Sequence, residues 1–389
     1  MITIIFILIF LLFYTYFAYP VVLRVLNRFF ANPVKYNDKF SPDISVVISA
    51  YNEEDYIKDA ILSVFDSGYY KDKLKLYVGS DGCNDNTLKI LYELQTKFSN
   101  LFVYDYPRSG KNQTLNKLVP KTTTDYIFFM DADCRTTKNI FNQMIKYFAD
   151  EQVGIVLGSS VHIASEGKEK DTGRMGDVSY HSFERNMRLY EGNIQSTVNS
   201  FGPLYGIRRD VYEPIPNDKV CDDFLPILKT VEKDKRVIFN PEGFAYEVRP
   251  KTLKDEFHRR IRSVSCGMAS LWMKKNVMSP KYKWVPFFLL SHKILRWVTP
   301  FILLLLAFGT MLISDQSVLK APFIWIQIAF YIVAIIGWGL EKIKIKIFPF
   351  NTCLFFIIMN VGMLFAFFRF MAGMSNAIWS RETIKEDKS

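Results

Sequence analysis

Apolar residues are spread unevenly along this chain of 389 residues. Four nearly uninterrupted apolar runs occupy residues 2–23, 297–313, 321–340 and 347–368. Each run is long enough to cross, or nearly cross, a hydrocarbon layer of about 30 Å. The stretch between the first and second runs has the mixed composition of a globular domain. The pattern therefore predicts four membrane spans around one folded domain.

Charges beside the apolar runs predict the orientation of the chain in the membrane. The first run lacks a basic leading segment and a small-residue cleavage site, which favours a retained anchor over a signal peptide. Arg24, Arg28 and Lys35 follow it and place that end in the cytoplasm, and three lysines in 341–346 return the chain there. We expect a multi-pass protein of the cell inner (cytoplasmic) membrane with its domain on the cytoplasmic face. The expected parts are a 1–23 transmembrane anchor, a 24–283 cytoplasmic domain, a 284–296 interfacial helix, 297–372 as three transmembrane helices and a 373–389 polar tail.

Within the domain, short apolar runs alternate with helical stretches. Residues 54–67 are one of these helical stretches, because their apolar residues are spaced to lie on one face of a helix. Such alternation favours an α/β fold with a doubly wound, mostly parallel sheet. Polar turns would then share the carboxyl edge of the sheet, where such folds bind ligands. The predicted strands are 44–49, 74–79, 101–104, 126–130 and 153–159.

Paired carboxylates follow two parts of this pattern. Asp131 and Asp133 come directly after an apolar run, and carboxylates at this spacing can reach one hard divalent cation. Asp81 ends another run in the same way. A second pair, Asp222 and Asp223, precedes an expected helix over 224–232, where its simpler role is an N-cap. These positions predict a site for a metal ion and a diphosphate.

A basic cluster precedes the second apolar run. Arg259, Arg260 and Arg262 could contact lipid headgroups, or could hold a diphosphate in bidentate fashion. The charged stretch 164–192 is expected to be an acceptor-side segment.

Composition excludes several other functions. The net charge of +10 comes largely from basic residues beside the apolar runs, which favours an anionic leaflet over nucleic acid as the partner. Five scattered cysteines form no C-x-x-C pair, which argues against a zinc site or a disulfide framework. His181, His258 and His292 are isolated in sequence and are expected to pack at the surface or at the membrane interface and not to act in catalysis. Spans without ionisable residues argue against a transporter.

Six motifs follow one another along the chain, at 45–54, 80–87, 110–111 with 115–116, 131–133, 202–209 and 222–223. Taken in this order, they resemble those of membrane-bound family 2 glycosyltransferases, the superfamily of cellulose, chitin, hyaluronan and poly-N-acetylglucosamine synthases. This resemblance implies a GT-A fold and inverting, metal-dependent transfer from a nucleotide sugar, expected to be a UDP-sugar, to a hydroxyl of a glycan or glycolipid acceptor. The expected purpose is exopolysaccharide or cell-envelope glycan synthesis.

The resemblance also implies roles for single residues. Asp223 matches the catalytic base, beside Asp222, which replaces the family's glutamate. Asp133, and also Asp131, would hold Mg²⁺ or Mn²⁺, which draws charge off the leaving nucleoside diphosphate. The residues expected to bind the nucleotide sugar are Tyr51, Glu53, Asp81, Lys111, Asp131, Arg259, Arg260 and Arg262.

One motif departs from the family's pattern. Processive synthases carry Gln-x-x-Arg-Trp where this chain reads Arg-Arg-Ile-Arg-Ser-Val over 259–264, so the arginines are kept and the tryptophan is absent. We therefore expect single addition or a short product. The alternatives are transfer to a polyprenyl phosphate, or a catalytically silent receptor that binds a nucleotide at the membrane.

Overall fold

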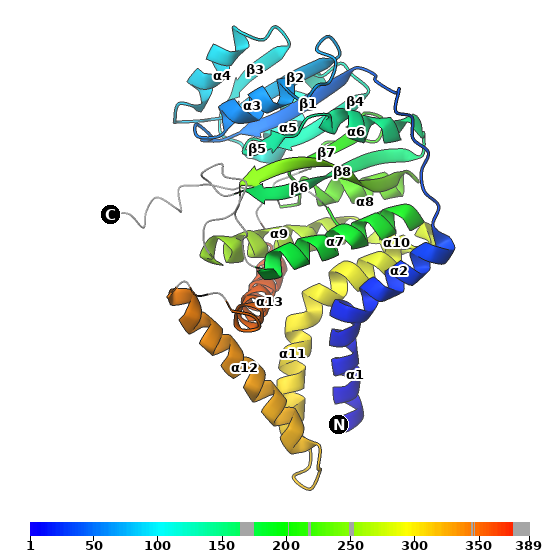
Figure 1. The fold of residues 1–389 in the computed structure, drawn as a ribbon, viewed down its shortest axis with the longest axis vertical. Coiled ribbons are helices and arrows are strands. Elements are labelled where there is room, and N and C mark those ends of the chain that lie inside the picture. The colour runs from blue at the N-terminus through cyan, green and yellow to red at the C-terminus, as the bar shows by residue number, and fades with distance from the viewer. Residues whose placement is uncertain are drawn as a thin grey trace.

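The computed structural model describes residues 1–163, 175–200, 202–216, 219–248, 253–343, 345 and 347–375. Figure 1 shows three layers: a domain built on a sheet, a middle layer of helices beneath it, and long apolar helices that point away from the domain. The middle layer lies between the sheet domain and the outer ends of the apolar helices.

In the described part of the chain, the domain contains one sheet of eight strands in the order β3-β2-β1-β4-β7-β6-β8-β5. Strands β1, β2, β3 and β4 are mutually parallel neighbours, whereas β7 runs antiparallel to both β4 and β6. All five predicted strands are present, and the sheet is mixed beyond β4. The strands are β1 (Ile44–Ala50), β2 (Leu74–Asp81), β3 (Leu101–Tyr106), β4 (Tyr126–Asp131), β5 (Cys134–Thr136), β6 (Val153–Ile163), β7 (Leu204–Arg208) and β8 (Arg236–Val248).

Helices cover both faces of this sheet. The central strand β1 is buried along almost its whole length, which explains its continuous apolar sequence. One core cluster packs β1, β2 and β4 against three helices, and a second cluster packs the other face against two. The helices of the first face are α3 (Ile57–Phe65), α4 (Thr87–Gln95) and α6 (Ile140–Ile145), and those of the second are α5 (Lys111–Leu118) and α8 (Phe224–Glu232).

The middle layer is fastened to the domain by polar contacts. In α9, the Ser270 hydroxyl accepts from the Cys221 amide at 3.0 Å. Lys274, just past that helix, pairs with Glu232 of α8 at 2.5 Å. The helices of this layer are α2 (Tyr19–Phe30), α7 (Met175–Ile194), α9 (Leu253–Met273) and α10 (Val285–Phe288). From residue 175 onward, the expected acceptor-side segment 164–192 is therefore part of α7. Residues 164–174 of that segment lie outside the described part of the chain.

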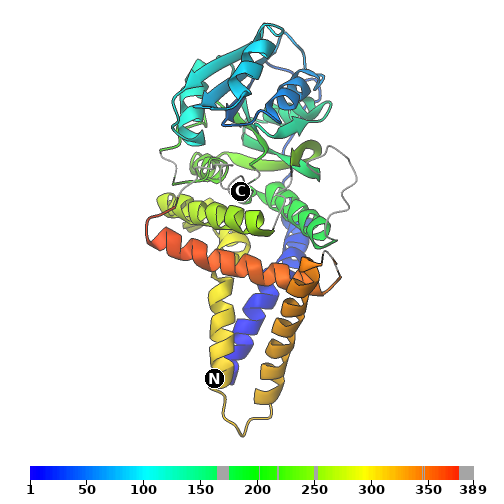
Figure 2. The same ribbon diagram turned by 90° about the vertical axis from the view of Figure 1, so that its left-hand side faces the viewer.

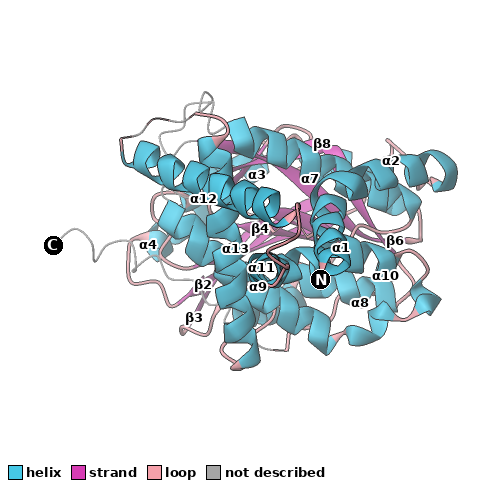
Figure 3. Ribbon diagram, turned by 90° about the horizontal axis from the view of Figure 1, so that it is seen from below, coloured by secondary structure: helices cyan, strands magenta, loops and turns pink. Residues whose placement is uncertain are grey.

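Among the residues that the structure describes, four helices are long and apolar enough to cross a membrane. The first, Ile2–Phe30, joins α1 (Ile2–Phe13) to α2 through a π-helical turn, and Figure 1 shows the chain bending there. The second, Val285–Met311, runs without a break through α10, a π-helical segment and α11 (Leu295–Met311). Figure 3 shows α1 and α11 side by side. The expected interfacial helix and the span after it are thus one helical unit.

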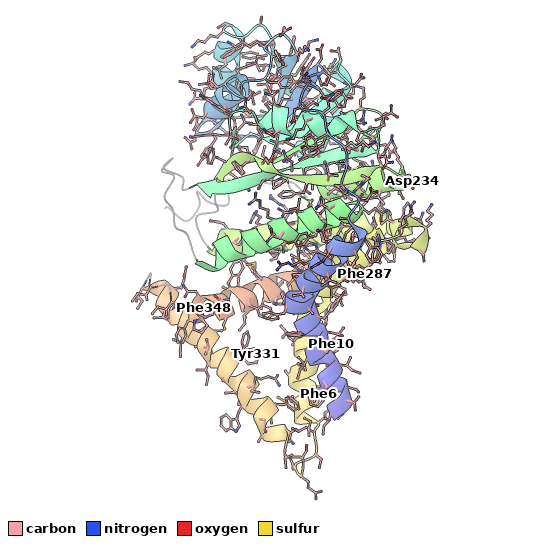
Figure 4. The ribbon with its side chains drawn as sticks, turned by 45° about the vertical axis from the view of Figure 1, so that its right-hand side comes forward. Phe6, Phe10, Asp234, Phe287, Tyr331 and Phe348 are labelled. Atoms are coloured by element: carbon pink, nitrogen blue, oxygen red, sulfur yellow. The ribbon has the colours of Figure 1, made fainter. Side chains whose placement is uncertain are left out.

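The last two apolar helices differ in direction. Helix α12 (Lys320–Lys342) points away from the domain like α1 and α11, whereas α13 (Phe350–Met371) lies across them, beneath α9 (Figures 1 and 2). Figure 4 shows Phe6 and Phe10 on α1 and Phe348 where the chain passes from α12 into α13.

Gly206 in β7 lies where the centre of the sheet has no room for a larger side chain. A Cβ on Gly206 would lie 2.7 Å from the ring of Phe128, which is fully buried and held edge-to-face by Phe141. We expect Gly206→Ala to lower the free energy of unfolding by about 1–3 kcal/mol, because the ring has no room to move. Thermal unfolding in detergent measures it. Gly192→Ala is the matched control, since its Cβ meets only ordinary contacts from 3.4 Å; equal effects of the two changes would contradict this account.

Candidate functional site

A lysine ammonium group joins two carboxylates at the carboxyl edge of the sheet. Lys111 Nζ lies 2.5 Å from Asp131 Oδ1 and 2.5 Å from Asp222 Oδ2. Lys111 opens α5, Asp131 ends β4, and Asp222 lies just before α8. Their side chains keep exposed fractions of 36%, 30% and 21%, so a ligand can reach all three. The structure thus brings together three residues that the sequence placed far apart.

The segment that leads into β7 holds this arrangement in place. The Pro203 carbonyl accepts from the Asp131 amide at 3.1 Å, and the Tyr205 hydroxyl donates to the Asp222 carbonyl at 2.9 Å. Gly202 lies against Asp223, because a Cβ there would be 3.2 Å from Asp223 Oδ2. One short segment therefore fixes both acidic pairs relative to each other.

The two neighbouring aspartates differ in their affinity for a proton. Burial raises the pKa of the Asp222 carboxyl, but the Lys111 ammonium and Arg262 outweigh it, so this pKa lies below its usual range. Burial and the charge of Asp222 raise the pKa of Asp223 above its usual range, although Lys293 and Lys111 oppose the change. Two carboxyls whose environments move their pKa values apart are suited to different roles. Asp222 is held as an anion, and Asp223 is the better proton acceptor.

A second cluster lies at the ends of β1 and β2. Asp81 pairs with Arg108 and accepts hydrogen bonds from the amides of Ser109 and Gly110 at 2.7 and 3.0 Å. The Arg108 guanidinium also lies 3.5 Å from the centroid of the Tyr51 ring. Tyr51 and Asp81, both expected at a nucleoside, are therefore neighbours, and the Asp81 carboxylate is bound by the 108–110 turn in this structure.

Arg108 is a site residue that the sequence did not single out. The available signal was its position two residues before the Gly110–Lys111 motif. Glu53, the third residue expected near a nucleoside, is buried, and its amide donates to the Thr87 hydroxyl at 2.8 Å.

The three arginines that could hold a diphosphate have different partners in the structure. Arg262 is the arginine whose charge acts on Asp222. Arg259 pairs with Glu256 at 2.8 Å on the surface of α9, and the Arg260 Nε lies 3.3 Å from the sulfur of Met359 in α13. The structure thus brings Arg262 to the acidic pair and directs the other two elsewhere.

The carboxylates of 131–133 offer oxygen ligands for a hard cation. No group of three or more His, Cys, Asp or Glu side chains that could hold a metal occurs among the described residues. Mg²⁺ usually takes only one or two carboxylates and completes its shell with water and substrate phosphates. The position of the Lys111 ammonium beside Asp131 shows that this edge of the sheet already stabilises a positive charge. Asp131 and Asp133 therefore fit a Mg²⁺ or Mn²⁺ ion shared with a diphosphate.

A buried polar network lies between the site and the apolar helices. His292 donates or accepts through both ring nitrogens, to Glu191 at 2.6 Å and to Glu184 at 3.0 Å. Glu184 also pairs with Arg296, and Glu191 accepts from the Tyr19 hydroxyl at 2.8 Å. His292 is isolated in sequence but not in space. The available signal was helical spacing: the two glutamates share one face of α7, and His292 and Arg296 share one face of the helix they lie on.

Lys293 follows His292 and lies close to the acidic pair. Its ammonium lies 4.7 Å from the ring centroid of Phe224, the first residue after Asp223, and its charge acts on the Asp223 carboxyl. A residue of the second candidate span therefore influences the expected base.

Comparison with known proteins shows which proteins this chain is similar to. Residues 45–214 match the family model Glycosyl transferase family 2. The poly-beta-1,6-N-acetyl-D-glucosamine synthase of Staphylococcus aureus (strain MSSA476) is 23% identical over 272 residues, which cover 66% of this chain and 65% of that protein. Its counterpart from Staphylococcus epidermidis is 22% identical over 229 residues, 58% of this chain and 54% of that protein. The chain thus spans just under two thirds of the length of the first of these relatives and about half of the second.

A solved structure shows the same fold. The mannosyltransferase PcManGT from Pyrobaculum calidifontis, in complex with GDP-Man and Mn²⁺, superposes with a TM-score of 0.71 at 19% identity. The match covers 95% of this chain and 99% of that chain. The expected GT-A fold with long apolar helices is confirmed.

The buried network generates a prediction about stability. Glu191 is fully buried and holds His292, Tyr19 and Thr197. We expect Glu191→Ala to lower the free energy of unfolding by about 3–5 kcal/mol, because it leaves buried polar groups without their carboxylate. Thermal unfolding of the full chain in detergent measures the loss. The control is Glu93→Ala on the exposed face of α4, expected within about 0.5 kcal/mol; a wild-type melting curve for Glu191→Ala would refute the structural role.

Proposed function

Because residues 45–214 form a glycosyl transferase family 2 domain, we propose that this protein transfers a sugar from a nucleotide sugar to a hydroxyl group. The donor is a UDP-sugar and the acceptor is a glycan or glycolipid at the cytoplasmic face of the membrane. The product serves exopolysaccharide or cell-envelope glycan synthesis, in keeping with the names of the relatives. The single observation that carries this proposal is the Lys111 bridge between Asp131 and Asp222.

Lys111 connects the proposed site of the donor diphosphate with the acidic pair that is proposed to act on the acceptor. A donor diphosphate carries charge that Lys111 and Arg262 can balance. Lys111 lies within reach of both acidic pairs, so an anion bound there would lie beside Asp222 and Asp223. The nucleoside binds at the same edge of the sheet, to Tyr51, Glu53, Asp81 and Arg108. The sugar is thereby directed toward the acidic pair.

Asp223 acts as the general base. Its raised pKa and its position beside Gly202 suit a carboxylate that takes a proton from an acceptor hydroxyl. The hydroxyl oxygen then attacks the anomeric carbon from the face opposite the leaving group, which inverts the configuration. Asp222 remains ionised and keeps Lys111 in place.

Asp133, together with Asp131, would hold Mg²⁺ or Mn²⁺. The ion supplies charge neutralisation for the departing nucleoside diphosphate. The absence of the tryptophan of processive synthases supports single addition or a short product.

Substitution of the base separates binding from chemistry. We expect Asp223→Asn to lower kcat at least about 100-fold, because the amide cannot take the proton, while the affinity for UDP changes little. Radiolabelled sugar transfer and calorimetry measure the two quantities. Asp222→Asn is the matched comparison and should change the affinity for UDP as well, because Lys111 then lacks one of the two carboxylates that hold it in place. Full activity of Asp223→Asn on a lipid phosphate would instead favour the polyprenyl-phosphate reaction, whose acceptor is already ionised. Tight nucleotide binding without transfer to any acceptor would favour a silent receptor.

The proposed base also predicts a pH dependence. Asp223 is active when deprotonated, so kcat rises as the pH passes upward through its raised pKa. Four groups act on this carboxyl: Asp222, Lys293, Lys111 and the Ser200 hydroxyl. Lys293→Gln removes a charge that lowers the pKa of Asp223, so we expect the acidic limb of the kcat profile to move to higher pH. Lys293→Arg should leave the limb near its wild-type position, and the exposed Lys281→Gln should not move it. An unmoved limb in Lys293→Gln would contradict the coupling.

A further inference from the structure

We propose that α13 lies in the plane of the membrane leaflet beneath the catalytic domain and does not cross the bilayer. Its apolar length alone makes it a candidate span. Its direction and contacts point to a different position. Three spans, α1, α11 and α12, then remain, and residue 375 lies on the same side of the membrane as the domain. This inference does not depend on the proposed activity.

Helix α13 packs lengthwise against α9. Phe257 near the start of α9 contacts Phe365, with ring centroids 6.1 Å apart, and Trp272 near its end contacts Phe370 at 6.5 Å. These contacts span about four turns of α9. Between them, Ile261, Val264 and Met268 of α9 share a core cluster with Met363 and Ala366 of α13.

Helix α9 is itself part of the domain side. The Ser270 hydroxyl of α9 accepts from the Cys221 amide, and Lys274, just past α9, pairs with Glu232 at the end of α8. Helix α9 therefore lies between α8 on one side and α13 on the other. Figures 1 and 2 agree, because both show α13 directly beneath α9 and across the direction of α11.

A charged pair lies beside the middle of α13. Arg260 contacts Met359, and a Cβ on Gly362 would lie 3.5 Å from the Arg260 side chain. Arg260 also lies 4.0 Å from Glu256. If α13 crossed the bilayer, these charges would lie at its centre, where ionisable side chains are strongly disfavoured. At the headgroup level the same charges remain near water.

The end of α13 returns to the domain side. The Ser375 hydroxyl donates to the Ser265 carbonyl of α9 at 3.2 Å, and Ser375 is buried. A helix that crossed the bilayer would carry this residue to the opposite face.

The outward face of α13 has the chemistry of a leaflet-inserted surface. Val361 and Phe368 lie at helical spacing and are 39% and 58% exposed. Phe365 lies between them and is 55% exposed even though one side of its ring contacts Phe257 of α9. The adjoining spans extend this apolar surface, and Arg369 in the last turn suits the headgroup region. The occupant of this face is therefore the lipid leaflet. Because Arg262 lies on α9, the leaflet-docked helix also supports a residue of the proposed diphosphate site.

The first test locates the end of α13 by cysteine labelling in sealed membrane vesicles of both orientations. The full chain carries Cys83→Ser and Cys353→Ser, because the other three cysteines are buried. Met374→Cys is the probe, Lys97→Cys reports the domain side, and Gln316→Cys reports the loop between α11 and α12. We expect Met374→Cys to react with a membrane-impermeant maleimide in the same vesicles as Lys97→Cys. Reaction in the vesicles that label Gln316→Cys would overturn the proposal.

The second test measures depth and remains decisive if labelling at position 374 is slow. Nitroxide labels are placed at Val361, Phe365 and Phe368 of the same background, and collision with oxygen and with a water-soluble relaxant gives each depth. An in-plane helix places all three labels at one shallow depth. A crossing helix separates the first and last by about 10 Å along the bilayer normal. The second pattern would refute the proposal.

Discussion

The site depends on one charge balance, in which a lysine ammonium lies between carboxylates from two different parts of the chain. Lys111 pairs with Asp131 at the end of β4 and with Asp222 before α8. Without it, the fold would bring acidic groups together at one edge of the sheet without compensation, which is costly in a partly buried site. The same balance leaves Asp222 ionised and makes Asp223 the more basic neighbour. The structure therefore gives these adjacent, chemically identical residues different affinities for a proton.

The middle layer connects this site to the apolar helices through polar contacts. The Cys221 amide, one residue before the acidic pair, is held by Ser270 of α9. Arg262 of the same helix acts on Asp222, while Lys293 acts on Asp223 from the second candidate span. The buried network around His292 fixes that span against α7. The apolar helices and the domain thus contribute to one polar centre, in which buried charges are paired at their junction.

Local patterns in the sequence predicted much of this molecule. The five strands, the helix over 224–232 and the long apolar helices follow from periodicity and length, which are local properties. The antiparallel β7 was not predicted, because its two-sided burial and its Gly206 hide the alternation that marks a strand. His292 and Arg108 were missed as site residues since their partners lie far away in sequence. The direction of α13 could not be read from hydropathy, because an apolar helix in a leaflet and one across it have similar compositions.

The central claim is that the Lys111 bridge is a site for a nucleoside diphosphate and a divalent ion. Titration of the purified full-length protein with UDP and GDP, in Mn²⁺ or in EDTA, tests it most directly when wild type and Lys111→Met are compared. The account predicts binding that requires Mn²⁺ and that Lys111→Met weakens at least about tenfold, since a charge-assisted contact is worth about 1.5–3 kcal/mol. Binding of equal strength in both proteins, with or without the metal, would contradict it.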